Sequence, residues 1–154
     1  MNIETANSVT QIESIRPLAI EWKAMSQQNK FGLEVDVDVF LSSLADMIFN
    51  DNSDLLMLMD GIEVVGIMGV MKFKSPFGKE QVANEHYLFV KKGHSISGGS
   101  RLIGEAGRWA KEHGCSHLIL SASNVASRLH DKVCNLYERL GLSKFETSYI
   151  KEII

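Results

Sequence analysis

The sequence has few cysteines and prolines, and it lacks long apolar runs. Among its 154 residues are 2 cysteines and 2 prolines. Cys115 and Cys134 do not have CxxC spacing, so the sequence does not support a disulfide framework or a zinc site. Strongly apolar runs such as 55–59 are far shorter than the roughly 20 residues that span a bilayer. We therefore expect buried or idle thiols, no metal site and no integral membrane segment.

The sequence also lacks an excess of basic residues. Its 16 basic and 19 acidic residues give a formal net charge of -3. Binding to a phosphate backbone needs clustered lysine and arginine, so we do not expect nucleic acid as a partner. Residues 1–5 have neither the basic stretch nor the apolar stretch of a secretory signal, and the cytoplasm is the expected location.

The residues that are present indicate one globular domain. Apolar residues make up 45% of the chain and charged residues 23%, which is typical of a soluble protein that folds alone. The length is close to the common size of one domain. Because no repeat, low-complexity tract or linker divides the sequence, we predict a single domain over residues 1–154.

Hydrophobic periodicity predicts an α/β fold with a mixed sheet. Asp36 is the expected N-cap of one helix, and Asp60-Gly61 is the expected turn of a β-hairpin. Gly114 and Gly141 are placed to end two further helices. The predicted helices cover 13–28, 37–48, a segment that follows residue 100, and 124–140, and the predicted strands cover 55–59, 64–71, 86–90, 117–122 and 145–154.

The segment over residues 93–100 is rich in glycine and serine and lies between a predicted strand and a predicted helix. A helix N-terminus carries unsatisfied N–H groups and partial positive charge, so small residues in front of it suit a phosphate. Glycine and serine are also ordinary capping residues. The pattern alone leaves both interpretations open.

The longer run from Leu88-Phe89-Val90 through this segment to Leu136-Tyr137-Glu138-Arg139-Leu140-Gly141-Leu142 resembles the GNAT N-acetyltransferase superfamily. In that family a strand ending in valine is followed by an Arg/Gln-x-x-Gly-x-Gly/Ala loop, and a later Tyr-x-x-x-Gly-Phe segment carries a catalytic tyrosine. The resemblance covers about residue 55 to the C-terminus. It implies a single domain whose mostly antiparallel sheet has a parallel pair splayed at the CoA site, flanked by about four helices.

The resemblance also implies acetyl-CoA as co-substrate and direct transfer of its acetyl group to a primary amine. Here His94 stands near the family's leading Arg or Gln, and Ser97 replaces its first glycine. Lys91 and Lys92 stand in place of the family's proline, and either reach CoA phosphates or are solvated. Asn124 lies farther from Tyr137 than the family's asparagine lies from its tyrosine. The residues implied to bind the cofactor are Leu88, Phe89, Val90, His94, Ser95, Ile96, Ser97, Gly98, Gly99, Ser100 and Arg101.

Two residues are candidates for proton transfer. Tyr137 lies on the apolar stripe of its predicted helix, where it is either a core tyrosine or, as the resemblance implies, the acid that protonates the leaving thiolate. Glu85 matches the region of the family's base, and it is otherwise an ordinary carboxylate at a strand end. His86 is the alternative base, which strand alternation directs to the opposite face.

Two other classes of function are compatible with these patterns. One is a catalytically silent acyl-CoA-binding or protein-interaction module on the same fold. The other is a nucleotide-binding α/β domain, but GxxxxGK[ST] and GxGxxG motifs are both missing. For an enzyme, the acceptor is a small-molecule or peptide amine, and a homodimer is possible on general frequency.

Overall fold

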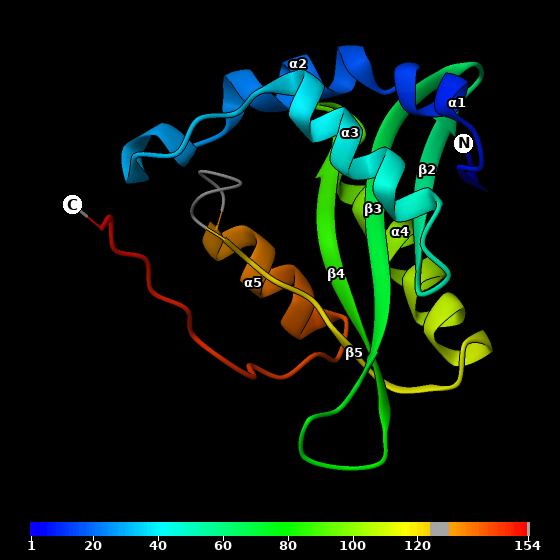
Figure 1. Ribbon diagram of the computed structural model, residues 1–154, viewed down its shortest axis with the longest axis vertical. Coiled ribbons are helices and arrows are strands. Elements are labelled where there is room, and N and C mark those ends of the chain that lie inside the picture. Colours follow the sequence, from blue (N-terminus) through cyan, green and yellow to red (C-terminus); the bar gives the residue numbers. More distant parts are fainter. Residues whose placement is uncertain (124–129, 154) are drawn as a thin grey trace.

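The computed structural model describes residues 1–123 and 130–153 (Figure 1). Strands and helices alternate in the second half of the chain, whereas helices and a hairpin make up most of the first half. In chain order the elements are β1 (Asn2–Thr5), α1 (Val9–Glu13), α2 (Arg16–Met25), the 3-10 helix η1 (Gln28–Phe31), α3 (Val37–Ile48), β2 (Ser53–Asp60), β3 (Glu63–Lys74), β4 (Gln81–Val90), α4 (Ser95–Glu112), β5 (Cys115–Ile119) and α5 (His130–Arg139).

The strands form one mixed sheet in the order β1-β2-β3-β4-β5. Strands β1 to β4 pair with one another in antiparallel fashion, and β5 runs parallel to β4. The hairpin predicted at Asp60-Gly61 is confirmed, since the ladder between β2 and β3 extends to the pair of Asp60 and Glu63. In the turn, Gly61 adopts a φ of 61°, which favours glycine. The predicted fold class, with its parallel pair, is therefore confirmed.

Helices cover both faces of the sheet (Figure 1). On one face α1, α2 and α3 pack against β2 and β3 through side chains that include Ile15, Leu44 and Met57. On the other face α4 packs through Leu102 and Ala106 against a second apolar cluster. The sheet is thus buried on both sides. Among the described residues, no helix combines the length and the apolar character that crossing a membrane requires.

The first predicted helix is divided in two. Instead of one helix over 13–28, the chain forms α1 and then α2, which begins at Arg16. Pro17 lies in the first turn of α2, where its missing N–H costs nothing; farther inside a helix its ring would clash with the carbonyl four residues earlier. The predicted N-cap is confirmed, because the Asp36 side chain accepts a hydrogen bond from the Val39 N–H at 3.0 Å.

Strands β4 and β5 separate halfway along β4. Their ladder runs from Gln81 and Cys115 to Asn84 and Ile119, whereas β4 continues to Val90 paired with β3 alone in the described part of the chain. Strand β4 is therefore longer than the predicted 86–90, and β5 ends before the predicted residue 122. Strand β4 begins earlier because the polar residues at its start join the ladder with β3, and β5 ends earlier because its pairing with β4 stops at Ile119.

The predicted last strand over 145–154 is wrong for its described residues. Residues 143–153 form no regular element, and Figure 1 shows this segment (red) running apart from the sheet. Alternating apolar and polar residues favour an extended chain, but a strand also needs a partner edge. Phe145 and Tyr149 are largely exposed here, so the segment gains little burial.

Two neighbouring glycines of α4 should respond differently to alanine. A Cβ at Gly98 would lie 2.7 Å from Leu58 Cδ2 and 3.0 Å from Val90 Cγ1, whereas a Cβ at Gly99 would meet no atom within 4 Å. Both changes raise helix propensity similarly. We expect Gly98→Ala to be less stable than Gly99→Ala by about 1–3 kcal/mol because of overpacking, measured by urea denaturation. Equal stabilities would contradict this close approach of α4 to the sheet.

Candidate active site

Glu85 lies on β4 directly beyond the last pair of the parallel ladder. Only 9% of it is exposed, and its carboxylate Oε2 accepts a hydrogen bond from the Ser121 N–H at 2.9 Å. Burial disfavours the charged carboxylate and raises the pKa of Glu85 to about 7, against the opposing effect of the Ser121 hydrogen bond. Glu85 is therefore poised to exchange a proton near neutral pH.

Tyr137 reaches the same place from α5. Its hydroxyl donates a hydrogen bond to the Ser121 carbonyl oxygen at 3.0 Å, and only 8% of the residue is exposed. Burial, followed by the negative charge of Glu85, raises the pKa of Tyr137 above that of an ordinary phenol. The hydroxyl consequently stays protonated at neutral pH and can serve as a proton donor.

Ser121 connects the two side chains through its own main chain. Its N–H binds Glu85 and its carbonyl binds Tyr137. These groups can do so because the ladder between β4 and β5 ends at Ile119, two residues earlier. Sequence reasoning missed Ser121, since it placed this residue inside a regular strand. Ser121 could be found only from the position at which β4 and β5 separate, and the pattern of apolar residues does not indicate that position.

The neighbouring His86 is not part of this cluster. It is the extra residue of a β-bulge, because Val70 pairs with Glu85 and Gly69 with Tyr87. His86 is exposed, whereas Glu85 is buried. Of the two candidate bases, Glu85 is therefore the one that the structure places beside Tyr137.

The second half of β4 lines the gap between the separated strands. In the described part of the chain, Leu88, Phe89 and Val90 pair with β3 on one side and have no ladder partner on the other. Leu88 and Val90 contact the core cluster under α4, and Phe89 contacts the cluster under α1–α3. The main chain of this stretch is the part of the sheet that is available to a ligand entering between β4 and β5.

The helix after β4 begins earlier than predicted. Its first residue is Ser95 and its N-cap is His94, so the expected loop over residues 93–100 ends at His94. The Gly98 N–H already donates to the His94 carbonyl at 2.9 Å. Helix geometry uses the N–H groups of Gly99, Ser100 and Arg101 in the same way. The first-turn N–H groups without an acceptor inside the helix belong to Ser95, Ile96 and Ser97.

A family model decides what this arrangement belongs to. The acetyltransferase (GNAT) family model matches residues 19–142, which include β4, α4, Glu85 and Tyr137. This chain is a GNAT family member. Its family, fold and acetyltransferase relationship thus agree with the resemblance seen in the sequence.

Solved structures share the fold across almost the whole chain. The chain is similar to a transcriptional regulator from Bacillus halodurans C-125, with 16% identity, 99% of both chains covered and a TM-score of 0.77. It is similar to a ribosomal-protein-alanine N-acetyltransferase from Brucella melitensis biovar Abortus 2308, with 17% identity, 99% and 100% covered and a TM-score of 0.71. An aminoglycoside acetyltransferase from an uncultured soil metagenomic sample, in complex with trehalose, has 13% identity, 99% and 95% covered and a TM-score of 0.73. No curated protein sequence matches.

Several charged residues around the start of α4 in this GNAT domain have partners within the chain. His94 Nε2 lies 3.1 Å from Asp60 Oδ2, and the Arg101 guanidinium donates to the Met1 carbonyl at 2.6 Å. Lys91 forms an ion pair with Glu63, while the Lys92 N–H lies 3.4 Å from Glu21 Oε1. Lys91 and Arg101 are therefore engaged by Glu63 and by the Met1 carbonyl, respectively.

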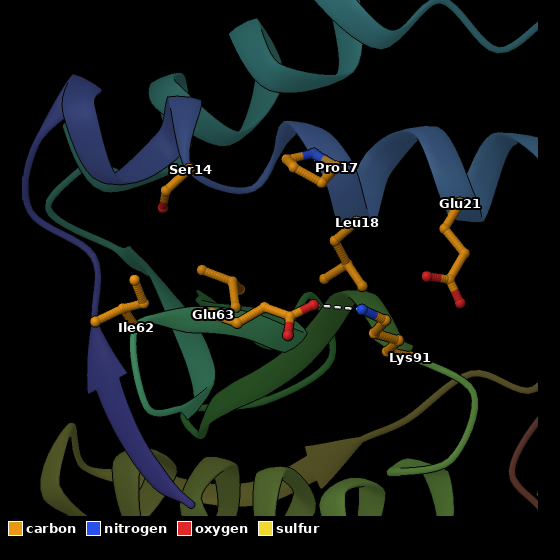
Figure 2. Close-up of a pocket in the computed structure, with 8 residues that line it drawn as sticks. Ser14, Pro17, Leu18, Glu21, Ile62, Glu63 and Lys91 are labelled. Atoms are coloured by element: carbon orange, nitrogen blue, oxygen red, sulfur yellow. Dashed lines mark hydrogen bonds and ion pairs between the residues drawn. The ribbon is translucent and has the colours of Figure 1, made fainter.

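A pocket of about 310 Å³ lies beside Lys91 (Figure 2). Figure 2 shows Leu18 and Glu21 reaching into it from α2 and Glu63 from the start of β3, with the ion pair to Lys91 between them. Because Lys91 follows Glu85 by six residues of extended chain, roughly 20 Å separates this pocket from Glu85 and Tyr137. The pocket is therefore remote from the two candidates for proton transfer.

Two remaining expectations concern metal ligands and Asn124. Within residues 1–123 and 130–153, the structure has no group of three or more His, Cys, Asp and Glu side chains arranged to hold a metal ion. Asn124 lies outside the described residues.

Proposed function

We propose that this GNAT domain transfers an acetyl group from acetyl-CoA to a primary amine by direct attack. The observation that carries the proposal is the convergence of Glu85 and Tyr137 on Ser121, where a buried acid with a pKa of about 7 and a protonated phenol lie side by side. A proton acceptor and a proton donor are the two groups that aminolysis of a thioester needs.

The reaction follows from these two groups. Glu85 accepts a proton from the substrate ammonium, directly or through a water, and the free amine attacks the thioester carbonyl carbon. A C–N bond forms as the C–S bond breaks, Tyr137 gives its proton to the departing thiolate, and the resulting tyrosinate takes the second proton that the nitrogen of the new amide loses. Those N–H groups of Leu88–Val90 that point away from β3 stabilise the carbonyl oxygen as it gains charge. Proton transfer of this kind contributes roughly 10²–10⁴-fold to a rate.

Acetyl-CoA would bind where β4 separates from β5, next to the start of α4. Its pyrophosphate would accept hydrogen bonds from the first-turn N–H groups of Ser95, Ile96 and Ser97, at the positive end of the helix dipole. Its extended pantetheine arm would lie along the unpaired side of β4. Gly98 contributes by bringing the helix close to Val90, which positions these N–H groups next to the strand end.

The acceptor is a small-molecule or peptide amine. Two of the similar structures are named for a ribosomal-protein alanine and for an aminoglycoside, so acceptors of both sizes occur on this fold. The chain's net charge of -3 favours a cationic amine over a large anionic acceptor.

A charge in the first turn of α4 tests cofactor binding. Ser97 is exposed at the third helical position, where a glutamate favours the helix but repels a pyrophosphate. We expect Ser97→Glu to weaken acetyl-CoA binding about tenfold or more in isothermal titration, because the new carboxylate would repel the negatively charged pyrophosphate. The control is Ser97→Gln, whose side chain has the shape of glutamate but no charge. It should bind acetyl-CoA nearly as the wild type does.

The outcomes separate the possible failures of this proposal. Equal binding by the Glu and Gln variants would place the phosphates elsewhere. Absence of binding by the wild-type protein would remove acetyl-CoA as the co-substrate. Binding without transfer to any amine in a screen would instead favour the catalytically silent acyl-CoA-binding module on the same fold.

A further inference from the structure

One face of α5 carries three reactive side chains. His130, Cys134 and Tyr137 follow the i, i+4, i+7 spacing that aligns residues along a helix. Tyr137 is bound to Ser121 next to Glu85, so this face is directed toward the proposed reaction site. Cys134 is close enough for its charge to contribute to the raised pKa of Tyr137.

Cys134 has a proton acceptor within reach. His130 Nε2 lies 3.6 Å from Cys134 Sγ, within the range of a hydrogen bond to sulfur. The other ring nitrogen, Nδ1, is buried and has no partner in the described part of the chain. The titratable groups that the described structure links to the thiol are thus His130, which lies beside Sγ, and Tyr137 on the same helix face; Glu85 in turn acts on Tyr137. A neutral imidazole can take the thiol proton, and the thiolate is the nucleophilic form of cysteine.

The second cysteine provides an internal contrast. Cys115 is also half-buried, at the start of β5, but the described structure gives it no imidazole partner. Burial raises the pKa of the Cys115 thiol, and the charge of Lys72 offsets this in part. Cys115 should therefore remain protonated at neutral pH.

We propose that Cys134 is a modification site that reacts with small disulfides at the wall of the active site. The Cys134 sulfur attacks one sulfur of a disulfide R–S–S–R, the bond from Cys134 to that sulfur forms, and the R–S–S–R bond breaks. The leaving thiolate takes the proton that His130 removed from Cys134. Cys134 is oxidised to a mixed disulfide and one half of the reagent is reduced to a thiol. The added group then lies one helical turn from Tyr137 and obstructs access to it.

The modification itself does not rest on the proposed acetyl transfer, although its inhibitory effect does. The test uses cystamine with the full chain, samples quenched with acid at intervals, and mass mapping of the two cysteine-containing peptides. At pH 7 we expect Cys134 to react about tenfold or more faster than Cys115, because only Cys134 has an imidazole beside its sulfur in the described structure. Equal rates at pH 7 in the wild-type chain would overturn the proposal.

The His130→Gln variant, made in a Cys115→Ser background, isolates the role of the imidazole. Its Cys134 should react about tenfold more slowly at pH 7 than Cys134 in the background protein. An unchanged rate at pH 7, with an unchanged far-UV spectrum, would contradict activation by His130. Because both readouts are masses, they hold whether or not acetyl transfer is found.

Discussion

Tyr137→Phe should lower kcat by about 10²–10⁴-fold while acetyl-CoA binding changes little. The substitution removes the hydroxyl that donates to the Ser121 carbonyl and keeps the ring, which is almost fully buried. The leaving thiolate then departs without a positioned acid, and the loss matches the range for general acid catalysis. Steady-state kinetics with an amine found by screening, together with titration of acetyl-CoA, measure the two quantities.

Tyr149→Phe is the matched control for this experiment. The same atom is removed, but Tyr149 lies in the C-terminal segment and 92% of it is exposed. Its kcat should equal that of the wild type. If Tyr137→Phe also keeps full kcat, the hydroxyl is structural and another group protonates the thiolate. If it loses acetyl-CoA binding as well, the loss of the Ser121 contact has disturbed the site rather than the chemistry.

The sequence carried the identity of the two proton-transfer candidates because both sit in motifs that short spacings define. Tyr137 precedes Gly141 by four residues, and Glu85 directly precedes the predicted strand over 86–90. Their meeting at Ser121 was not predictable from spacing. It depends on where β4 and β5 separate and on the bulge at His86, and a one-residue irregularity of this kind leaves no trace in the hydrophobic pattern.

The start of α4 shows a second limit of sequence reasoning. Glycine and serine are poor helix formers, so a run of them was predicted as a loop. In the structure the helix nevertheless includes them, because Gly98 allows α4 to pack closely on Leu58 and Val90. Tertiary packing outweighs the propensity of these residues. The N–H groups that we propose for phosphate binding are therefore those of Ser95–Ser97 instead of the predicted Ser97–Ser100.

Glu85→Gln tests the proposed base through the pH dependence of the rate. Glu85 must be ionised to accept a proton, so kcat/KM of the wild type should rise with pH through an apparent pKa near 7. In the Gln variant, kcat/KM should no longer rise with pH through this value, and at pH 8 it should be about 10²-fold lower than in the wild type. Glu80→Gln, at an exposed position before β4, should keep the wild-type profile. If kcat/KM of the Gln variant still rises with pH as in the wild type, another group is the base.

The same substitution should remove a pH dependence of stability. The folded chain binds a proton at Glu85 more tightly than the unfolded chain does, because the pKa is raised from 4.5 to about 7. Between these values the unfolded state binds fewer protons, so stability from this group is complete below pH 4.5 and is lost as pH rises through 7. The loss amounts to about 3 kcal/mol for a shift of this size. Urea denaturation at pH 5 and pH 8 should show that Glu85→Gln gains stability relative to the wild type at the higher pH; a constant difference between the two proteins would mean that Glu85 stays ionised in the folded chain.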